Sequence, residues 1–169
     1  MLIIIRAQQL GMSQSLAQYL PSILNAASIF GRIVPGIVAD KMGRFNVMII
    51  TCGFSAIIVL ALWLPAKANA PIIIFSVLYG FSSGAFVSLG PALIAQISPI
   101  RELGVRSGTF FLFVAFAGLT GNPIGGALVG VDEGDYIYLQ VFCGVAMVMG
   151  TLVYIASRYV QCGFKLQRI

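Results

Sequence analysis

The sequence predicts an all-α membrane protein with five transmembrane helices, and two observations lead to that prediction. Of the 169 residues, 59% are hydrophobic and only 9% are charged, whereas soluble domains carry about 25% charged residues. The charges are also clustered, which leaves five stretches without Asp, Glu, Lys or Arg: residues 7–31, 45–66, 68–100, 107–131 and 136–157. Each stretch exceeds the ~20 apolar residues that cross a bilayer core of about 30 Å. We therefore expect an integral, multi-pass protein in a lipid bilayer.

Within a transmembrane domain at 14–160, the expected helices span about residues 15–36, 45–64, 71–95, 104–129 and 136–159. The third uncharged stretch is too short for two crossings and a turn, so it predicts one long, tilted helix. Residues 1–13 are expected to form an unanchored stub, because Arg6 and two glutamines closely follow a short apolar run. Residues 161–169 are expected to form a tail.

The distribution of basic residues predicts the orientation. Alternating the connections places seven basic residues on one side: Lys41, Arg44, Arg101, Arg106, Arg158, Lys165 and Arg168. The other side receives two basic residues and the acidic run: Arg6, Lys67, Asp132, Glu133 and Asp135. Because cytoplasmic loops carry the excess of Lys and Arg, we expect the C-terminus inside and the N-terminus outside. The sequence does not distinguish the plasma membrane from an organelle membrane.

The composition also excludes several classes of function. With no histidine and five acidic residues, the chain has few ligands for a metal site and little material for acid–base or nucleophilic catalysis. We therefore expect no enzyme, no metal and no cofactor. The net charge of +5 comes largely from basic connections between spans, which is a topology signal rather than an indication of nucleic acid binding.

Arg32 is the cation that lies well inside an expected span, where a guanidinium facing lipid is costly. Gln18, Ser22, Asn25 and Ser28 precede it at helical spacing, so all five share one arc of the first helix. A guanidinium matches the geometry of a carboxylate. This polar stripe predicts the wall of a solute pathway, with Arg32, Asn25, Ser28 and Ser22 as solute-binding residues. Alternatively, Arg32 extends to the lipid headgroups and has no solute role.

Two charged connections are expected on the cytoplasmic side. The first, between the first two helices, contains a Gly–Asp–basic–Gly–Arg pattern formed by Gly36, Asp40, Lys41, Gly43 and Arg44. Its glycines favour a tight turn, and Asp40 can cap a helix or pair with a cation. The second contains Arg101, Glu102 and Arg106. We hypothesise that the second connection pairs with Asp40 and latches the cytoplasmic face.

Small residues and a proline mark two further helices. In the third helix, Gly80, Gly84 and Ser88 are spaced to allow a close helix contact. In the fourth, Gly121, Asn122 and Pro123 predict a kink. This break is equally compatible with a hinge and with tight packing.

The segment Gly36-Ile-Val-Ala-Asp40-Lys41-Met-Gly43-Arg44 resembles the signature loop of the major facilitator superfamily, which joins the second and third helices of each six-helix half. The wider pattern, over about residues 11–165, resembles the monocarboxylate transporter family, particularly its fungal branch. It is carried by Asn25-Ala-Ala-Ser28-Ile-Phe-Gly31-Arg32, Tyr79-Gly-Phe-Ser-Ser-Gly84, Ile100-Arg101-Glu102-Leu-Gly104-Val-Arg106, Leu119-Thr-Gly121-Asn122-Pro123 and Gly134-Asp135-Tyr136.

The resemblance implies a transporter of twelve helices, with the solute between two halves that alternate access by rocking. The chain would supply the eighth to twelfth helices, which are five of the six in the C-terminal half bundle. In the animal members, an arginine matching Arg32 is associated with binding the substrate carboxylate, and an aspartate one turn earlier acts in proton coupling. That earlier position is Ser28 here, so only the anion-binding role carries over.

Two functions follow from this reading. The first is secondary transport of a small organic solute, such as a monocarboxylate or another organic anion, by a transporter of which this chain is a C-terminal fragment. The alternative is a truncated, non-transporting membrane polypeptide or an assembly partner. The alternative arises because a solute site between two halves needs the N-terminal half or another chain as partner.

Overall fold

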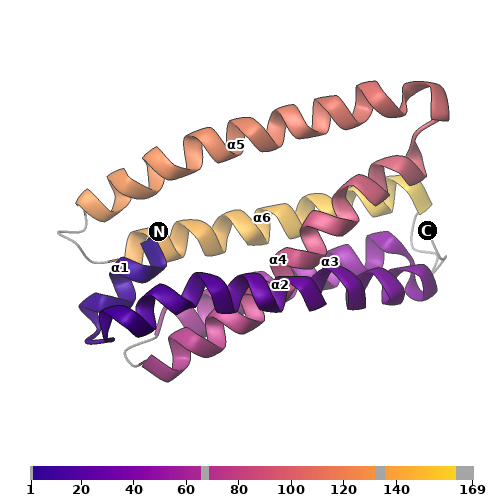
Figure 1. Cartoon of the computed structure of the whole chain (residues 1–169). Coiled ribbons are helices and arrows are strands. Elements are labelled where there is room, and N and C mark those ends of the chain that lie inside the picture. Colours follow the sequence, from indigo (N-terminus) through magenta and orange to yellow (C-terminus); the bar gives the residue numbers. More distant parts are fainter. Residues whose placement is uncertain (1, 66–68, 132–135, 163–169) are drawn as a thin grey trace.

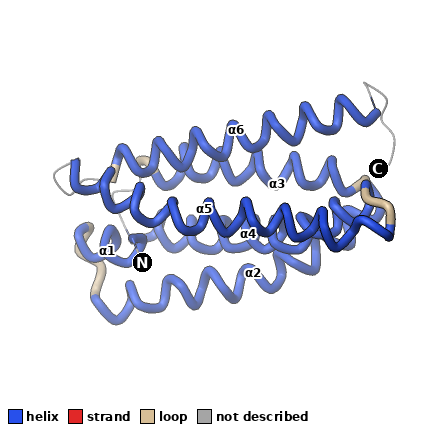
Figure 2. The backbone as a smooth tube through the Cα atoms, turned by 90° about the horizontal axis from the view of Figure 1, so that it is seen from above, coloured by secondary structure: helices blue, strands red, loops and turns tan. Residues whose placement is uncertain are grey.

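The computed structural model describes residues 2–65, 69–131 and 136–162. Its elements, in chain order, are α1 (Leu2–Gln9), α2 (Gln14–Met42), α3 (Arg44–Ile58), the π-helical turn η1 (Val59–Trp63), α4 (Asn69–Ile97), the 3₁₀ turn η2 (Ile100–Glu102), α5 (Leu103–Val131) and α6 (Ile137–Cys162). These ranges contain no strand (Figure 2). Five helical segments are long and apolar enough to cross a membrane. The predicted all-α, five-helix transmembrane class is therefore confirmed.

The five long helices lie roughly side by side, and α5 is set apart from the others (Figure 1). In the most apolar window of α3, which continues into η1, 50% of residues are buried inside the protein, against 6% in the window of η2 and α5. The core therefore lies among α2, α3, α4 and α6.

The contact between α2 and α4 brings backbone against backbone. A methyl group added at Gly31 of α2 would overlap the backbone of Phe81, and one at Gly84 of α4 would overlap that of Ser28. Gly80 is equally close to α2. Small residues permit this approach in a bilayer, where the attraction between helices comes from packing and hydrogen bonds rather than from exclusion of water. The close contact predicted at Gly80 and Gly84 is confirmed.

Buried side chains form three clusters along the bundle. One joins the end of α2 to α3 and α4 through Ala39, Phe45, Val47, Met48, Cys52, Ala85, Leu89 and Leu93. A second joins α1, α2 and α4 through Ala7, Met12, Ala17, Leu20 and Ile72. The third joins α3, η1, α4 and α6 through Ile58, Val59, Trp63, Phe75, Tyr136 and Leu139. The buried members of these clusters come from the segments around α1, α2, α3, η1, α4 and α6, and α5 contributes only the partly buried Leu128 and Val129 at the edge of the third cluster within the described residues.

The first connection differs from its prediction. We expected a loop over 37–44, but α2 continues through Gly36 and Asp40 to Met42. Gly43 alone separates α2 from α3, with a φ of 93°, and its N–H donates to the carbonyl of Ala39 at 2.9 Å. A glycine inside a helix is tolerated at a cost of about 1 kcal/mol, whereas a positive φ favours glycine strongly. The turn therefore forms at Gly43 rather than at Gly36.

The N-terminal segment also differs, because the expectation of an unanchored stub was wrong. Residues 2–9 form α1, and the chain turns at Gly11, where φ is 86°. Ala7 and Met12 are buried against Leu20 of α2 and Ile72 of α4. Figures 1 and 2 both place α1 beside the first turns of α2.

The remaining helix ends fall close to the predicted ones. The third, fourth and fifth predicted helices correspond to α4, α5 and α6, each a few residues longer than expected. Lys67, the acidic run Asp132, Glu133 and Asp135, and the tail residues Lys165 and Arg168 lie outside the described residues. The position of those charges stays a prediction.

Candidate functional site

An exposed polar stripe runs along α2. Gln18, Ser22, Asn25 and Arg32 are all exposed, and their spacing by whole turns places them on one side of the helix. The buried residues of α2 lie on a different face, formed by Ala17, Leu20, Ser28, Gly31, Pro35 and Ala39. The stripe is therefore free of the contact that α2 makes with α4.

Ser28 does not lie among the exposed stripe residues. Its side chain is 6% exposed, and its carbonyl faces Gly84 of α4 at the tight helix contact. Ser28 lies at the edge of the predicted arc, on the side that turns toward α4. On the exposed side, the residue between Asn25 and Arg32, one turn from each, is Ile29, which is 58% exposed. The exposed polar stripe is therefore interrupted by an apolar side chain, which the spacing of the polar residues alone did not indicate.

Arg32 lies about 15 Å along the helix axis from the Met42 end of α2, given the rise of an α-helix. Within the described part of the chain, its guanidinium makes no hydrogen bond or ion pair with a protein group. Five N–H donors are therefore available to an anion. Because a guanidinium at this depth is costly against hydrocarbon, it requires water, a headgroup, a partner chain or a solute.

The first charged connection is tied to the end of α4. A guanidinium nitrogen of Arg44 donates to the carbonyl of Ala92 at 3.2 Å, and another lies 3.6 Å from a carboxylate oxygen of Asp40. Asp40 and Lys41 are exposed. Arg44 thus links the start of α3 to α4, and Asp40 lies close to this link without being buried in it.

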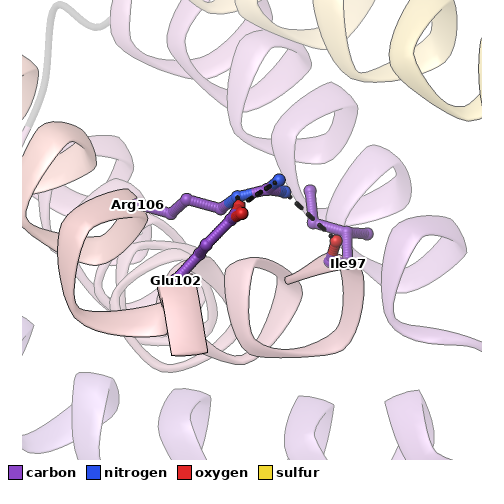
Figure 3. A network of polar contacts seen from close by, with 3 residues as sticks. All are labelled: Ile97, Glu102 and Arg106. Carbon is purple, nitrogen blue, oxygen red and sulfur yellow. Dashed lines mark hydrogen bonds and ion pairs between the residues drawn. The ribbon is translucent and has the colours of Figure 1, made fainter. Parts of the chain in front are cut away.

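The second charged connection is closed by Arg106 (Figure 3). Its Nε and Nη2 donate to Oε2 of Glu102 at 3.0 and 2.8 Å, and its Nη1 donates to the carbonyl of Ile97 at 3.3 Å. Arg106 therefore caps the last turn of α4 from the first turn of α5, while Arg101 is exposed. In this conformation Asp40 pairs with Arg44 and Glu102 with Arg106, so each carboxylate is paired within its own connection.

The Gly121–Pro123 segment of α5 stays helical. Gly121, Asn122 and Pro123 lie inside α5 and are exposed. Directly before this segment, the hydroxyl of Thr120 donates to the carbonyl of Phe116, one turn earlier, at 2.8 Å. This conformation does not distinguish a hinge from a packing element, so the hinge stays a prediction.

A polar and aromatic cluster at the opposite end of the bundle was not anticipated. Trp63 stacks on Phe75 with ring centroids 5.1 Å apart. Gln140 of α6 is 1% exposed and donates from Nε2 to the carbonyl of Trp63 at 3.1 Å. The guanidinium carbon of Arg6 lies 5.5 Å from the ring centroid of Tyr136. Burial raises the pKa of Tyr136 and the charge of Arg6 opposes that rise. The cluster fastens α1, η1, α4 and α6 together.

Comparison with known proteins identifies transporters. The family model described as Major Facilitator Superfamily matches residues 1–161. The chain is 49% identical over 164 residues to the MFS transporter asaE of Aspergillus flavus, covering 97% of this chain and 37% of that protein. It is 52% identical over 164 residues to the MFS-type transporter opdF of Penicillium oxalicum, covering 97% and 39%.

A third relative carries a more specific name. The Fujikurins efflux protein of Gibberella fujikuroi is 44% identical over 151 residues, which cover 89% of this chain and 32% of that protein. The chain thus spans 32–39% of the length of these three relatives. No solved structure matches the chain significantly.

Proposed function

Because the chain belongs to the Major Facilitator Superfamily, we propose that it helps to move a small organic anion across a membrane by alternating access. In this proposal the chain forms the C-terminal half bundle of a fungal-type monocarboxylate transporter relative, as the eighth to twelfth helices. The exposed stripe of α2 lines the path, with Arg32 as the anion ligand and Asn25 and Ser22 beside it. Ser28 supports the helix contact rather than the solute.

The observation that carries the proposal is the position of Arg32. It is exposed on α2, about 15 Å from the helix end, and it makes no ion pair within the described residues. An intramembrane cation generally faces a bundle interior or an aqueous cavity and marks a substrate or ion pathway. The neighbouring uncharged polar residues of the stripe favour the same assignment over a lipid-facing one.

We further propose that the Met42 end of α2 is cytoplasmic. Hydrogen bonds from Arg44 to Ala92 and from Arg106 to Ile97 place both charged connections at one end of the bundle. Lys41 and Arg101 belong to the same connections, so this end is strongly basic. Basic connections stay on the cytoplasmic side during insertion.

The direction of transport is proposed to be outward. This rests on the name of the Gibberella fujikuroi relative, which is an efflux protein. An exporter picks up its solute from the cytoplasmic side. In the proposed orientation, Arg32 lies nearer to that side than the other stripe residues do, so it would meet an acidic solute first.

A second candidate function is an assembly partner that has no transport activity without another polypeptide. The surface of α5 favours it, because Gly125 is the buried residue of that helix within the described chain. Phe113 and Leu119 are 70% and 72% exposed. Lipid or another polypeptide can cover this apolar surface. Lipid cannot satisfy the polar stripe of α2, so the stripe is the surface that calls for a second polypeptide.

The test compares Arg32→Gln with Arg32→Lys in the full gene product, reconstituted in liposomes. We expect Arg32→Gln to raise the KM for an organic acid about ten-fold or more, since a charge-assisted hydrogen bond contributes about 1.5–3 kcal/mol. Arg32→Lys should retain part of the affinity, because the charge remains but the planar fork is lost. Arg158→Gln, an arginine near the end of α6 with no proposed role, is the control and should leave the KM unchanged.

Two results would contradict these proposals. An unchanged KM in Arg32→Gln would remove Arg32 as the anion ligand and favour the headgroup interpretation. Transport by the purified 169-residue chain alone would exclude the second candidate function. Its failure to transport, together with activity of the full gene product, would support the need for a further polypeptide segment.

A further inference from the structure

We propose that the solute is an elongated amphipathic acid, with one acidic group and an uncharged oxygen about 10 Å away along the helix axis. This inference rests on the proposed role of α2 as the pathway wall, and it specifies the class of solute. A compact acid such as lactate is not expected to be the preferred solute.

The first group is a single positive charge. Arg32 is the charged residue of α2 that lies inside the helix, since Asp40 and Lys41 belong to its last turn. One guanidinium without a carboxylate partner balances one carboxylate of a solute. A solute with two acidic groups would leave the second one without a cation on this helix.

The second group is apolar. Ile29 is one turn from Arg32 and is 58% exposed, and Ile33 beside it is 56% exposed. Ser28, which could have offered a hydroxyl near this level, is buried against α4. The part of the solute next to its acidic group therefore meets aliphatic side chains, where a polar group would lose hydrogen bonds to water without replacement.

The third group is polar and uncharged. Asn25, Ser22 and Gln18 are exposed, and they lie about 10, 15 and 21 Å along the axis from Arg32. Their amide and hydroxyl groups both donate and accept hydrogen bonds. They suit hydroxyl, carbonyl or amide oxygens at the far end of a solute. An acid with only two or three carbons, held at Arg32, would reach none of them.

The test uses three labelled acids with the full gene product in liposomes: lactate, decanoate and ω-hydroxydecanoate. The hydroxyl of the last lies about 12 Å from its carboxylate carbon when the chain is extended, so it can reach Asn25, which lies roughly 10 Å from Arg32 along the axis. We expect ω-hydroxydecanoate to have the lowest KM. Asn25→Leu should raise that KM about five-fold, as loss of one net hydrogen bond implies, and should leave the KM for decanoate unchanged.

The matched control is Thr151→Val on α6. The Thr151 hydroxyl donates to the carbonyl of Met147 in its own helix at 2.8 Å, so this change also replaces a polar side chain in a span. It should affect none of the three KM values. Asn25→Gln keeps the amide and should restore part of the preference for the hydroxy acid.

The outcomes separate this inference from the proposed function. If Arg32→Gln raises the KM for the acids but Asn25→Leu affects decanoate and ω-hydroxydecanoate equally, Asn25 acts through packing and the elongated solute is wrong. A KM for lactate as low as that for ω-hydroxydecanoate would overturn it too. If no acid is transported, or if transport is indifferent to Arg32, the proposed anion transport itself fails.

Discussion

Helices α2 and α5 have the same length, 29 residues, and both contain glycine, but they differ in how they meet their neighbours. Gly31 of α2 lies against the backbone of α4, whereas a methyl group at Gly108, Gly118 or Gly121 of α5 would meet nothing within 4 Å. A glycine in these helices can therefore lie at a close contact with another helix, as Gly31 does, or on a surface that no other helix covers, as Gly118 does. Helix α2 packs tightly along α4, whereas α5 contacts its neighbours near its two ends, through the bond from Arg106 to Ile97 of α4 and through Leu128 and Val129.

The largest effect is expected where the α2–α4 contact is disrupted. Gly31→Ala would push its methyl group into the backbone of Phe81, and overpacking of this kind costs about 3 kcal/mol. Gly118→Ala in α5 meets open space and should stabilise the helix by about 0.8 kcal/mol through propensity. Thermal unfolding of the purified protein in detergent measures both. Shifts of the same sign at the two positions would refute the contrast.

An intermediate effect is expected at Gln140, which joins α6 to η1 through a buried hydrogen bond, whereas the bond from Arg106 of α5 to Ile97 is exposed. Gln140→Leu removes the hydrogen bond to the carbonyl of Trp63 and should destabilise the protein by about 1 kcal/mol. Thermal unfolding measures this loss. Thr151→Val, on the same helix, serves as the control and should change stability less. A stabilised Gln140→Leu protein would show that burying the amide costs more than its bond contributes.

The smallest effect is expected at the link between α4 and α5. The Glu102–Arg106 pair is exposed, and exposed pairs contribute about 0.2–1 kcal/mol. Glu102→Gln should therefore lower stability by about 0.5 kcal/mol or less, and high salt should reduce the difference further. Denaturation at low and high salt measures both quantities. A loss comparable to that of Gly31→Ala would mean that α5 is held far more firmly than its exposure indicates.

The five membrane-spanning helices were predictable because bilayer thickness imposes a minimum length on every uncharged stretch. The turn between α2 and α3 was predicted over residues 37–44, with both glycines favouring it, but the structure confines it to Gly43. Gly36 and Gly43 look alike in the sequence, and the requirement for a positive φ appears only in the folded chain. The packing of α1 was missed because it depends on Ile72, which lies far along the chain.

The candidate site was predictable to the extent that helical spacing determines it. That spacing placed Gln18, Ser22, Asn25 and Arg32 on one side of α2, where they are exposed together. It did not separate Ser28 from them, because the position of α4 decides which edge of the arc is covered. The hydrogen bond between Gln140 and Trp63 joins residues 77 positions apart, and no local pattern indicates such a pair.

The single-residue turn at Gly43 has a mechanical consequence. With one residue between α2 and α3, and with Arg44 bound to α4, there is no slack for α2 to tilt independently. A tilt of α2 would therefore displace α3 through Gly43 and α4 through the close contacts at the glycines. These three helices therefore form one tightly coupled unit, which α5 contacts at the bond from Arg106 to Ile97 and through Leu128 and Val129.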